Sequence, residues 1–393
     1  MQQISIQCSV QEQLSFIQLF INNPKMDFLK LTRRLNESIE VFVEEDQLMI
    51  FKNALNQKNI SYTVIIEDLE ATFDEEMRLN QAARLKSAVL NQTDVPFDYY
   101  PRYEEIEQYL KNLAINYKDI VTLEHIGYSF EGRSLYVVKI SRGGEGKFKI
   151  LIDAGIHARE WISPSTALYT IHQLVVNKSN EQLYENVDWY IIPSINPDGY
   201  EYSHTSYRLW RKTRSVDIKT ECRGVDANRN FELEWMTVGA SNDPCSEIYA
   251  GPNAFSENET QALRDFVLAN SNTIKVYLTL HSYGQYLLHP WGYTSDLPEN
   301  EPMLRNVGEA AAGAIAAKFG TKYVVGSSTN ILYAAAGGSD DWMMGVAGAD
   351  LSYTIELPGG RFDPPPSRIA SVGIETFEGF KIFQQFVEKK YVK

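Results

Sequence analysis

The sequence contains only three cysteines among 393 residues, at Cys8, Cys222 and Cys245. That number excludes a small fold held together by many disulfides. Long apolar runs are also missing, and no stretch reaches the roughly 18 residues that a membrane-spanning helix needs. Basic residues are outnumbered by acidic ones, and the net charge of −14 argues against nucleic acid as a partner. The same charge suits cationic partners, or it simply keeps the chain soluble. Neither a membrane nor nucleic acid is an expected partner.

The length and the apolar content of 44% predict two or three domains with a large core. The first residues lack a basic patch followed by an apolar core, so they do not predict a signal peptide. Residues 1–92 are interpreted as a separate small domain. Strands are expected at Ile4–Gln7, Ile39–Val43 and Ser61–Ile66, and helices at Gln11–Ile21 and Glu45–Gln57. With one strand not located, the order resembles the β-α-β-β-α-β ferredoxin-like arrangement.

A polar helix is expected next, from Leu69 to about Asn91, with few apolar side chains to anchor it. It carries the basic residues Arg84 and Lys86. An exposed, weakly anchored basic segment is where a protease cuts. We therefore expect cleavage after Arg84 or Lys86, or within the next few residues. The alternative is an ordinary surface helix between two permanent domains.

Residues 93–393 alternate apolar strands with helical segments such as Ser165–Val176 and Glu257–Ala269, which predicts an α/β domain with a parallel or mixed sheet. Three of the expected strands run into polar residues. They are Lys147–Gly155, which leads to His157 and Glu160, Lys275–Leu280, which leads to His281, and Leu351–Ile355, which leads to Glu356.

Ligands of open α/β sheets bind just beyond the carboxyl ends of the strands, so these polar residues are expected to meet there. Two histidines and one glutamate with an open position form a catalytic zinc set. The alternative is a chance match, because a short His-x-x-Glu pattern is common and a lone histidine is usually structural. The other histidines have that structural character, since none follows an apolar strand; they are His125, His172, His204 and His289.

Several ordered motifs between about residues 95 and 393 resemble those of the zinc metallocarboxypeptidases of the pancreatic A/B type. They are His157-Ala-Arg-Glu160-Trp-Ile-Ser-Pro, Asn196-Pro-Asp-Gly199, Tyr207-Arg-Leu-Trp-Arg211-Lys-Thr-Arg-Ser215, Asp226-Ala-Asn228-Arg229-Asn, His281-Ser-Tyr283, Gly337-Gly-Ser-Asp340-Asp-Trp342 and Glu356-Leu. The resemblance implies a mixed sheet of about eight strands between helices. The first domain is similar to the activation segment of the same family.

The resemblance also implies roles at the reaction centre. His157, Glu160 and His281 would hold one Zn²⁺, and Glu356 would act as general base. Arg211 would polarise the scissile carbonyl. Asp226 is similar to the carboxylate that orients a ligand histidine. A fourth metal ligand or a core ion pair is the alternative role for Glu356.

Substrate recognition is implied at further positions. Asn228 and Arg229 match the clamp for the C-terminal carboxylate, and Tyr333 matches the mobile tyrosine beside it. Asp340 lies at the position that is aspartate in B-type enzymes and apolar in A-type enzymes. Arg159 and Tyr283 resemble residues of outer subsites. In contrast, Arg208, Lys212 and Arg214 are interpreted as a solvated basic run, and Asp341 as structural.

Two further features follow from the resemblance. Cys222 and Cys245 flank a turn-rich loop and are implied to form a disulfide, which leaves Cys8 as a buried or free thiol. One departure from the family pattern follows Glu356, where the run Pro358-Gly-Gly-Arg361-Phe362-Asp-Pro-Pro-Pro366 replaces the usual residues. This run puts the fine substrate range and inhibitor sensitivity in doubt.

Together these features predict the secreted zymogen of a zinc carboxypeptidase of B type, which removes C-terminal Lys or Arg from peptides, with a role in digestion. Expected partners are peptides with a free C-terminus, an activating trypsin-like protease and proteinaceous carboxypeptidase inhibitors. One alternative keeps the chemistry but prefers apolar C-termini or has a broad preference. Two others are an inactive peptide-binding relative and a permanently two-domain binding protein.

Overall fold

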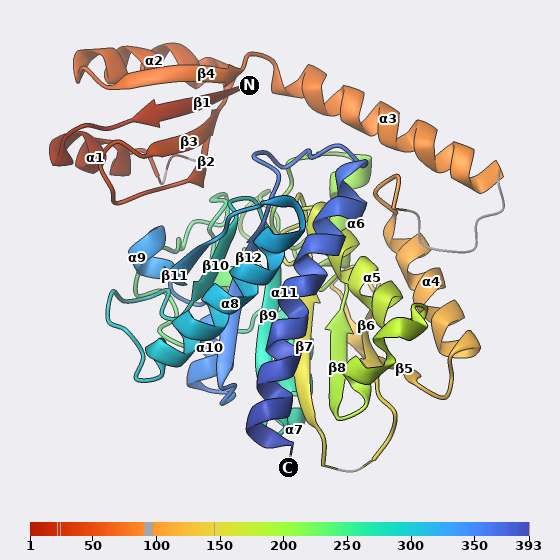
Figure 1. Cartoon of the computed structure of the whole chain (residues 1–393). Coiled ribbons are helices and arrows are strands. Elements are labelled where there is room, and N and C mark those ends of the chain that lie inside the picture. Colours follow the sequence, from red (N-terminus) through yellow and green to blue (C-terminus); the bar gives the residue numbers. More distant parts are fainter. Residues whose placement is uncertain (22, 24, 90–96, 145, 393) are drawn as a thin grey trace.

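The computed structural model describes residues 1–21, 23, 25–89, 97–144 and 146–392. Two β-sheets organise the described chain, one of four strands near the N-terminus and one of eight strands in the larger domain (Figure 1). The expected boundary between residues 92 and 93 falls outside the described residues. None of the described helices is long and apolar enough to cross a membrane.

The N-terminal domain has the β-α-β-β-α-β order that the sequence predicts. Its elements are β1 (Gln2–Gln7), α1 (Gln11–Gln18), β2 (Met26–Lys30), β3 (Ser38–Val43), α2 (Glu45–Gln57) and β4 (Ser61–Ile66). The antiparallel strands lie in the order β2-β3-β1-β4. The strand missing from the sequence analysis is β2, an edge strand whose Asp27 and Lys30 interrupt the apolar pattern. Cys8 is a free thiol buried in this domain's core.

Helix α3 (Leu69–Val89) leaves the small sheet and crosses the top of the larger domain towards α4 (Figure 1). The expectation that it is weakly anchored is wrong. Leu69 and Phe73 are buried, and the Glu76 carboxylate forms a buried ion pair with Arg208. The Asn80 side chain exchanges two hydrogen bonds with the backbone of Tyr100, at 2.7 and 3.0 Å. Polar side chains therefore anchor a helix that has few apolar ones.

The larger domain follows the predicted alternation of strands and helices. Its elements are α4 (Tyr103–Asn116), β5 (Val121–Tyr128), β6 (Ser134–Ile140), β7 (Phe148–Ala154), α5 (Ile162–Val175), the 3-10 helix η1 (Lys178–Tyr184), β8 (Val187–Ile192), α6 (Pro197–Thr205), the 3-10 helix η2 (Ala227–Arg229), α7 (Asn258–Asn270), β9 (Ile274–Ser282), β10 (Tyr286–His289), α8 (Glu301–Phe319), β11 (Val324–Ser327), α9 (Ser328–Ile331), α10 (Ser339–Gly345), β12 (Leu351–Leu357) and α11 (Arg368–Tyr391).

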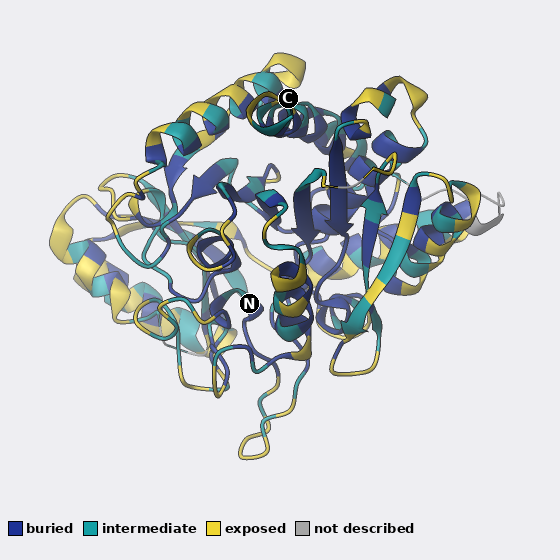
Figure 2. Ribbon diagram, turned by 90° about the horizontal axis from the view of Figure 1, so that it is seen from below, coloured by how far each residue is buried: buried dark blue, intermediate teal, exposed yellow. Residues whose placement is uncertain are grey.

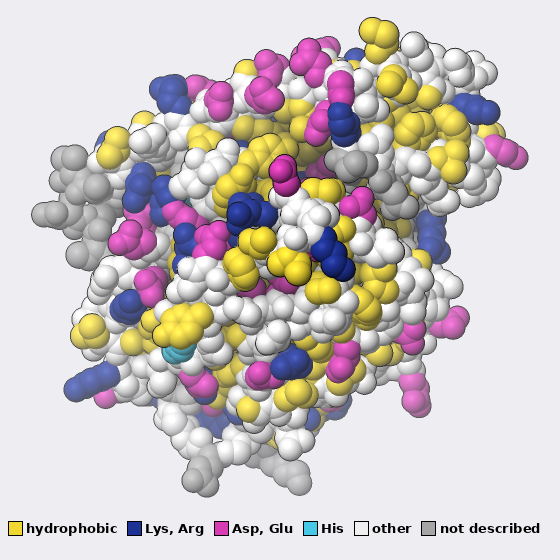
Figure 3. Space-filling view, turned by 180° about the vertical axis from the view of Figure 1, so that it is seen from behind, with side chains coloured by type: hydrophobic (Ala, Val, Ile, Leu, Met, Phe, Trp, Pro, Cys, Tyr) yellow, Lys and Arg dark blue, Asp and Glu magenta, His cyan; other side chains and the backbone are white. Residues whose placement is uncertain are grey.

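The eight strands form a mixed sheet in the order β11-β10-β12-β9-β7-β8-β6-β5, as expected for the fold class. Helices α5, α8 and α11 pack on one face around the main apolar core, while α7 and α10 pack on the other. The strands between them are mostly buried (Figure 2). On the face shown in Figure 3, acidic and basic side chains are interspersed with apolar ones, so the net negative charge is not gathered in a single patch there.

Strand register places the expected site residues side by side. The parallel strands β7, β9 and β12 are neighbours and end at the same edge of the sheet. In β9 and β12, His281 lies directly opposite Glu356. His157 and Glu160 follow β7 in the short loop that precedes α5. This edge of the sheet is therefore the place where the candidate site forms.

Candidate active site

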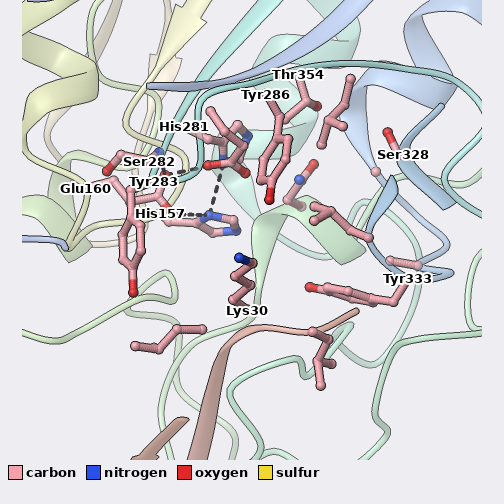
Figure 4. A pocket seen from close by; sticks show the side chains of 18 of the residues that line it. Lys30, His157, Glu160, His281, Ser282, Tyr283, Tyr286, Ser328, Tyr333 and Thr354 are labelled. Atoms are coloured by element: carbon pink, nitrogen blue, oxygen red, sulfur yellow. Dashed lines mark hydrogen bonds and ion pairs between the residues drawn. The ribbon is translucent and has the colours of Figure 1, made fainter. Parts of the chain in front are cut away.

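Two histidines and one glutamate converge at the carboxyl edge of the sheet (Figure 4). The potential ligand atoms of His157, Glu160 and His281 all lie within 4.8 Å of one another, and all three side chains are buried. The Nδ1 atoms of the two imidazoles are 3.1 Å apart. A Glu160 carboxylate oxygen lies 2.8 Å from Nδ1 of His157, and the other lies 3.3 Å from Nδ1 of His281. These three groups are the ones that the sequence analysis assigned to zinc.

The outer nitrogen of each imidazole already has a partner. Nε2 of His157 lies 3.2 Å from a carboxylate oxygen of Asp226, and Nε2 of His281 lies 3.2 Å from the Thr279 hydroxyl. Such outer partners fix the ring orientation of metal-ligating histidines. Both Nδ1 atoms are thereby free to face the Glu160 carboxylate. The donor set fits a zinc ion, which prefers imidazole nitrogen and carboxylate oxygen.

The electrostatics of this set favour a positive charge at its centre. Burial alone would raise the pKa of Glu160, but the two histidines outweigh burial and lower it. Burial would also lower the pKa of His281, yet the neighbouring Glu160 raises it to about 9. For His157, burial and the positive Arg211 lower the pKa. A buried carboxylate that stays ionised between two imidazoles is suited to a cation.

Glu356 stands beside this set on strand β12. Burial and the negative charge of Glu160 raise the pKa of Glu356 to about 8, although His281 and Arg211 act in the opposite direction. A divalent cation held by the neighbouring donor set would lower this pKa, because an adjacent positive charge favours the carboxylate.

A single buried carboxylate, that of Asp226, joins two parts of the site. One of its oxygens contacts His157 and accepts a hydrogen bond from the backbone N–H of Asn228 at 3.0 Å. The other accepts two hydrogen bonds from the Arg211 guanidinium, at 2.8 and 3.1 Å. These charges outweigh the effect of burial and hold the pKa of Asp226 well below its usual range. Asp226 thus orients a histidine and an arginine together.

Arg229 and Tyr333 line the same cavity, and the Arg229 guanidinium lies 3.4 Å from the Tyr333 hydroxyl. Asn228 also lines the cavity, and its side-chain oxygen accepts a hydrogen bond from the Ser339 backbone N–H. The cavity has a volume of about 140 Å³. It brings together the residues that the sequence analysis selected, which are His157, Arg159, Glu160, Arg211, Asn228, Arg229, His281, Tyr283, Tyr333, Asp340 and Glu356.

Asp340 is a buried member of the cavity wall at the start of α10, with 6% of its surface exposed. Burial raises its pKa, while the Asp341 backbone and the Thr354 hydroxyl act in the opposite direction. Among the described residues, no Lys or Arg forms an ion pair with Asp340. The neighbouring Asp341 differs, because its carboxylate accepts backbone hydrogen bonds from Gly292 and Tyr293. Asp341 therefore has structural partners, whereas Asp340 faces the cavity without a cation.

The N-terminal domain covers the cavity mouth with residues that the sequence analysis did not select. Asp27 of β2 forms an ion pair with Arg159, and Glu40 of β3 accepts a hydrogen bond from the Tyr283 hydroxyl at 2.7 Å. Lys30 of β2 points into the cavity from the opposite side to His157 (Figure 4). No sequence signal marks Asp27 or Glu40, because the partners Arg159 and Tyr283 lie more than 100 positions away.

The expectation of a solvated basic run is wrong for Arg208, Lys212 and Arg214, which are only 3–8% exposed. Arg208 stacks on the Trp161 ring, with 3.7 Å between the guanidinium carbon and the ring centroid, and pairs with Glu76. Lys212 donates a hydrogen bond to a backbone carbonyl, and Arg214 stacks on Tyr202. Aromatic faces and carbonyls thus replace water around these cations.

The proline-rich run after Glu356 supplies Phe362 to the rim of the cavity. Its ring lies 4.5 Å from the Arg159 guanidinium carbon and 5.1 Å from the Tyr283 ring centroid. Cys222 and Cys245 form the disulfide that the resemblance implies. The donor cluster found among the described residues consists of His157, Glu160 and His281.

Comparisons with known proteins agree with this geometry. A family model described as zinc carboxypeptidase matches residues 106–379, and another described as carboxypeptidase activation peptide matches residues 4–76. Carboxypeptidase B from Astacus astacus is 48% identical over 297 residues, which cover 74% of this chain and 98% of that protein. The crystal structure of carboxypeptidase A from Helicoverpa armigera is similar with a TM-score of 0.93 and 32% identity, over 100% of this chain and 98% of that one.

A third similar structure is bovine thrombin-activatable fibrinolysis inhibitor in complex with tick carboxypeptidase inhibitor. Its TM-score is 0.72 at 36% identity, over 75% of this chain and 99% of that chain. Names of both A and B type occur among these relatives, so similarity alone does not decide which C-terminal side chain is preferred. The matched models cover most of the chain and both of its domains. The chain therefore belongs to the zinc carboxypeptidase family of peptidases, as a zymogen that carries the family's activation peptide.

Proposed function

We propose that the activated chain hydrolyses the C-terminal peptide bond of peptides that end in Lys or Arg. The observation that carries this proposal is the Asp340 carboxylate, which shares a cavity with the metal-binding set and has no basic partner in the described part of the chain. A buried carboxylate pairs well with a cationic side chain, while its desolvation disfavours an apolar one.

His157, Glu160 and His281 would hold the zinc ion. When bound, zinc acts as a Lewis acid and makes a water molecule a nucleophile at neutral pH. Glu356 stands beside this set and accepts a proton from the attacking water, then passes it to the departing amine. Arg211, held by Asp226, donates hydrogen bonds to the carbonyl oxygen as negative charge develops on it.

The free carboxylate of the substrate is the group that distinguishes a C-terminal bond from an internal one. Arg229 and Asn228 bind this carboxylate, because a guanidinium fork and an amide can donate hydrogen bonds to it together. Tyr333 lies beside Arg229 and closes this end of the cavity. Arg159 and Tyr283 lie further out, where they contact residues before the scissile bond once the activation peptide has left.

Activation requires removal of the N-terminal domain from the cavity mouth, where Asp27 and Glu40 occupy Arg159 and Tyr283. The proposed cut is after Arg84 or Lys86, or in the residues that follow, by a trypsin-like protease. Lys86 is exposed, whereas Arg84 is partly buried and pairs with Glu105. The residues just beyond the helix lie outside the described part of the chain. Secretion, a digestive role and sensitivity to protein inhibitors of carboxypeptidases belong to the same proposal.

The experiment compares kcat/KM for two matched peptides, one ending in Arg and one in Phe, after limited trypsin treatment. Each is measured with and without a zinc chelator. We expect chelator-sensitive turnover that strongly favours Arg. A preference for Phe would favour the alternative, an enzyme of A type. An absence of turnover on both peptides would overturn the enzymatic proposal and favour a peptide-binding protein.

A further inference from the structure

Tyr286 stands next to Glu356 in the cavity, at the first position of β10. In the antiparallel pair β10–β12, Tyr286 lies directly opposite Glu356, and in the parallel pair β12–β9, Glu356 lies opposite His281. Residues that pair across neighbouring strands project from the same face of a sheet. His281, Glu356 and Tyr286 therefore form a row across three strands, with Tyr286 on the side of Glu356 away from the metal ligands.

The next row on the same face leads towards Asp340. Leu288 lies opposite Thr354 in the strands β10 and β12, and the Thr354 hydroxyl interacts with the Asp340 carboxylate. A C-terminal side chain that reaches Asp340 passes along this second row. Tyr286 and Glu356 lie one row nearer the carboxyl end of β12. With the C-terminal side chain directed to Asp340, the residue before the scissile bond would lie on this outer side, next to Tyr286.

The Tyr286 side chain is partly exposed and points its hydroxyl into the cavity (Figure 4). A tyrosine that serves only the core normally gives its hydroxyl a hydrogen-bond partner. Here the hydroxyl has none among the described residues. Lys30 of the activation peptide points into the same space from the opposite side (Figure 4). The ring and hydroxyl of Tyr286 are therefore available to a substrate once the activation peptide, with β2, has left the cavity.

We propose that Tyr286 is a specificity-determining residue, whose ring packs against the side chain of the penultimate substrate residue and favours an aromatic or large apolar side chain there. The inference rests on the proposed function, because it takes the scissile bond to lie at Glu356 with the C-terminal side chain directed to Asp340. The alternative role for Tyr286 is contact with the activation peptide alone, since Glu37, Arg34 and Glu40 lie near enough to act on it.

The test uses peptides that end in Arg and carry either Phe or Gly at the penultimate position. The trypsin-activated wild type, Tyr286→Leu and Tyr286→Phe are compared by the ratio of kcat/KM for the Phe peptide to that for the Gly peptide. We expect Tyr286→Leu to lower this ratio roughly threefold to tenfold, as for the loss of one aromatic pair. Tyr286→Phe keeps the ring and should retain the ratio. Tyr128→Leu, at an exposed tyrosine outside the cavity, is the matched control.

Two outcomes would overturn the inference. An unchanged ratio in Tyr286→Leu, with a normal zinc content, would mean that the ring does not contact the penultimate residue. An equal loss on both peptides would mean that Tyr286 acts on the fold or on Glu356 instead. Failure of the wild type to cleave either peptide is distinguishable from both, because it would overturn the proposed function itself.

Discussion

Replacing Asp340 by Asn should reverse the substrate preference while leaving the shape of the cavity almost unchanged. The carboxylate is 6% exposed, and none of the described Lys or Arg side chains is within ion-pair distance, so a substrate cation is its main source of compensation. Breaking one side of such a buried charge pair costs about 3 kcal/mol. That energy corresponds to a roughly 100-fold lower kcat/KM for a peptide ending in Arg.

For a peptide ending in Phe, the same substitution should raise kcat/KM, because no buried charge then has to be desolvated against an apolar ring. The assay measures initial rates for both peptides in competition, after identical activation by trypsin. Asp296→Asn, at an exposed position outside the cavity, controls for a general effect of the lost charge. Equal losses on both peptides, or an unchanged ratio of the two rates, would refute the assignment of Asp340 to the pocket.

Three further predictions concern the base, the activation peptide and stability. Glu356→Gln should lower kcat by about 10² to 10⁴, as for the loss of a general base, with zinc content unchanged when measured by elemental analysis. Loss of zinc in this variant would instead indicate a structural or ligand role. Asp27→Asn leaves Arg159 without its partner, so the released activation peptide should bind the mature enzyme about 3 kcal/mol more weakly in a calorimetric titration. Unchanged affinity would mean that this ion pair does not hold the peptide. Glu259 is buried, which raises its pKa to about 8, so the folded state holds a proton that the unfolded state releases. The contribution of Glu259 to the free energy of unfolding should therefore be largest below its unfolded pKa, and up to about 5 kcal/mol of it should be lost as pH rises through about 8. Glu259→Gln should flatten this slope in urea unfolding, and an unaltered slope would contradict the reasoning.

The sequence predicts the larger domain and its site well because strand ends and motifs coincide there. His157, His281 and Glu356 each follow an apolar run, and parallel strands with a common edge bring such positions together. The register of β9 and β12, with His281 opposite Glu356, is the detail that the sequence leaves open. The roles of these residues remain predictions, to be tested by the substitutions above.

The failures have one physical cause, which is that buried charges need partners far away in the chain. With charged residues such as Glu76, the sequence of α3 predicts a polar surface helix. Arg208 in the same way predicts that its own segment is solvated. In the structure Glu76 and Arg208, which are 132 positions apart in the sequence, are buried against each other. Strand β2 was missed for a related reason, since Asp27 and Lys30 face the larger domain rather than water. A local sequence pattern cannot show which distant residue a charged side chain pairs with.

The path of α3 has a consequence for the time course of activation. A cut beyond the helix leaves Glu76 paired with Arg208, Asn80 bonded to Tyr100 and Arg84 paired with Glu105. Scission of the chain and the appearance of activity are then separate events with separate rate constants. After the bond is broken, the rate of dissociation governs a lag, and dilution favours the free enzyme. The protease determines when activation begins, and the contacts between α3 and the larger domain determine how fast activity follows.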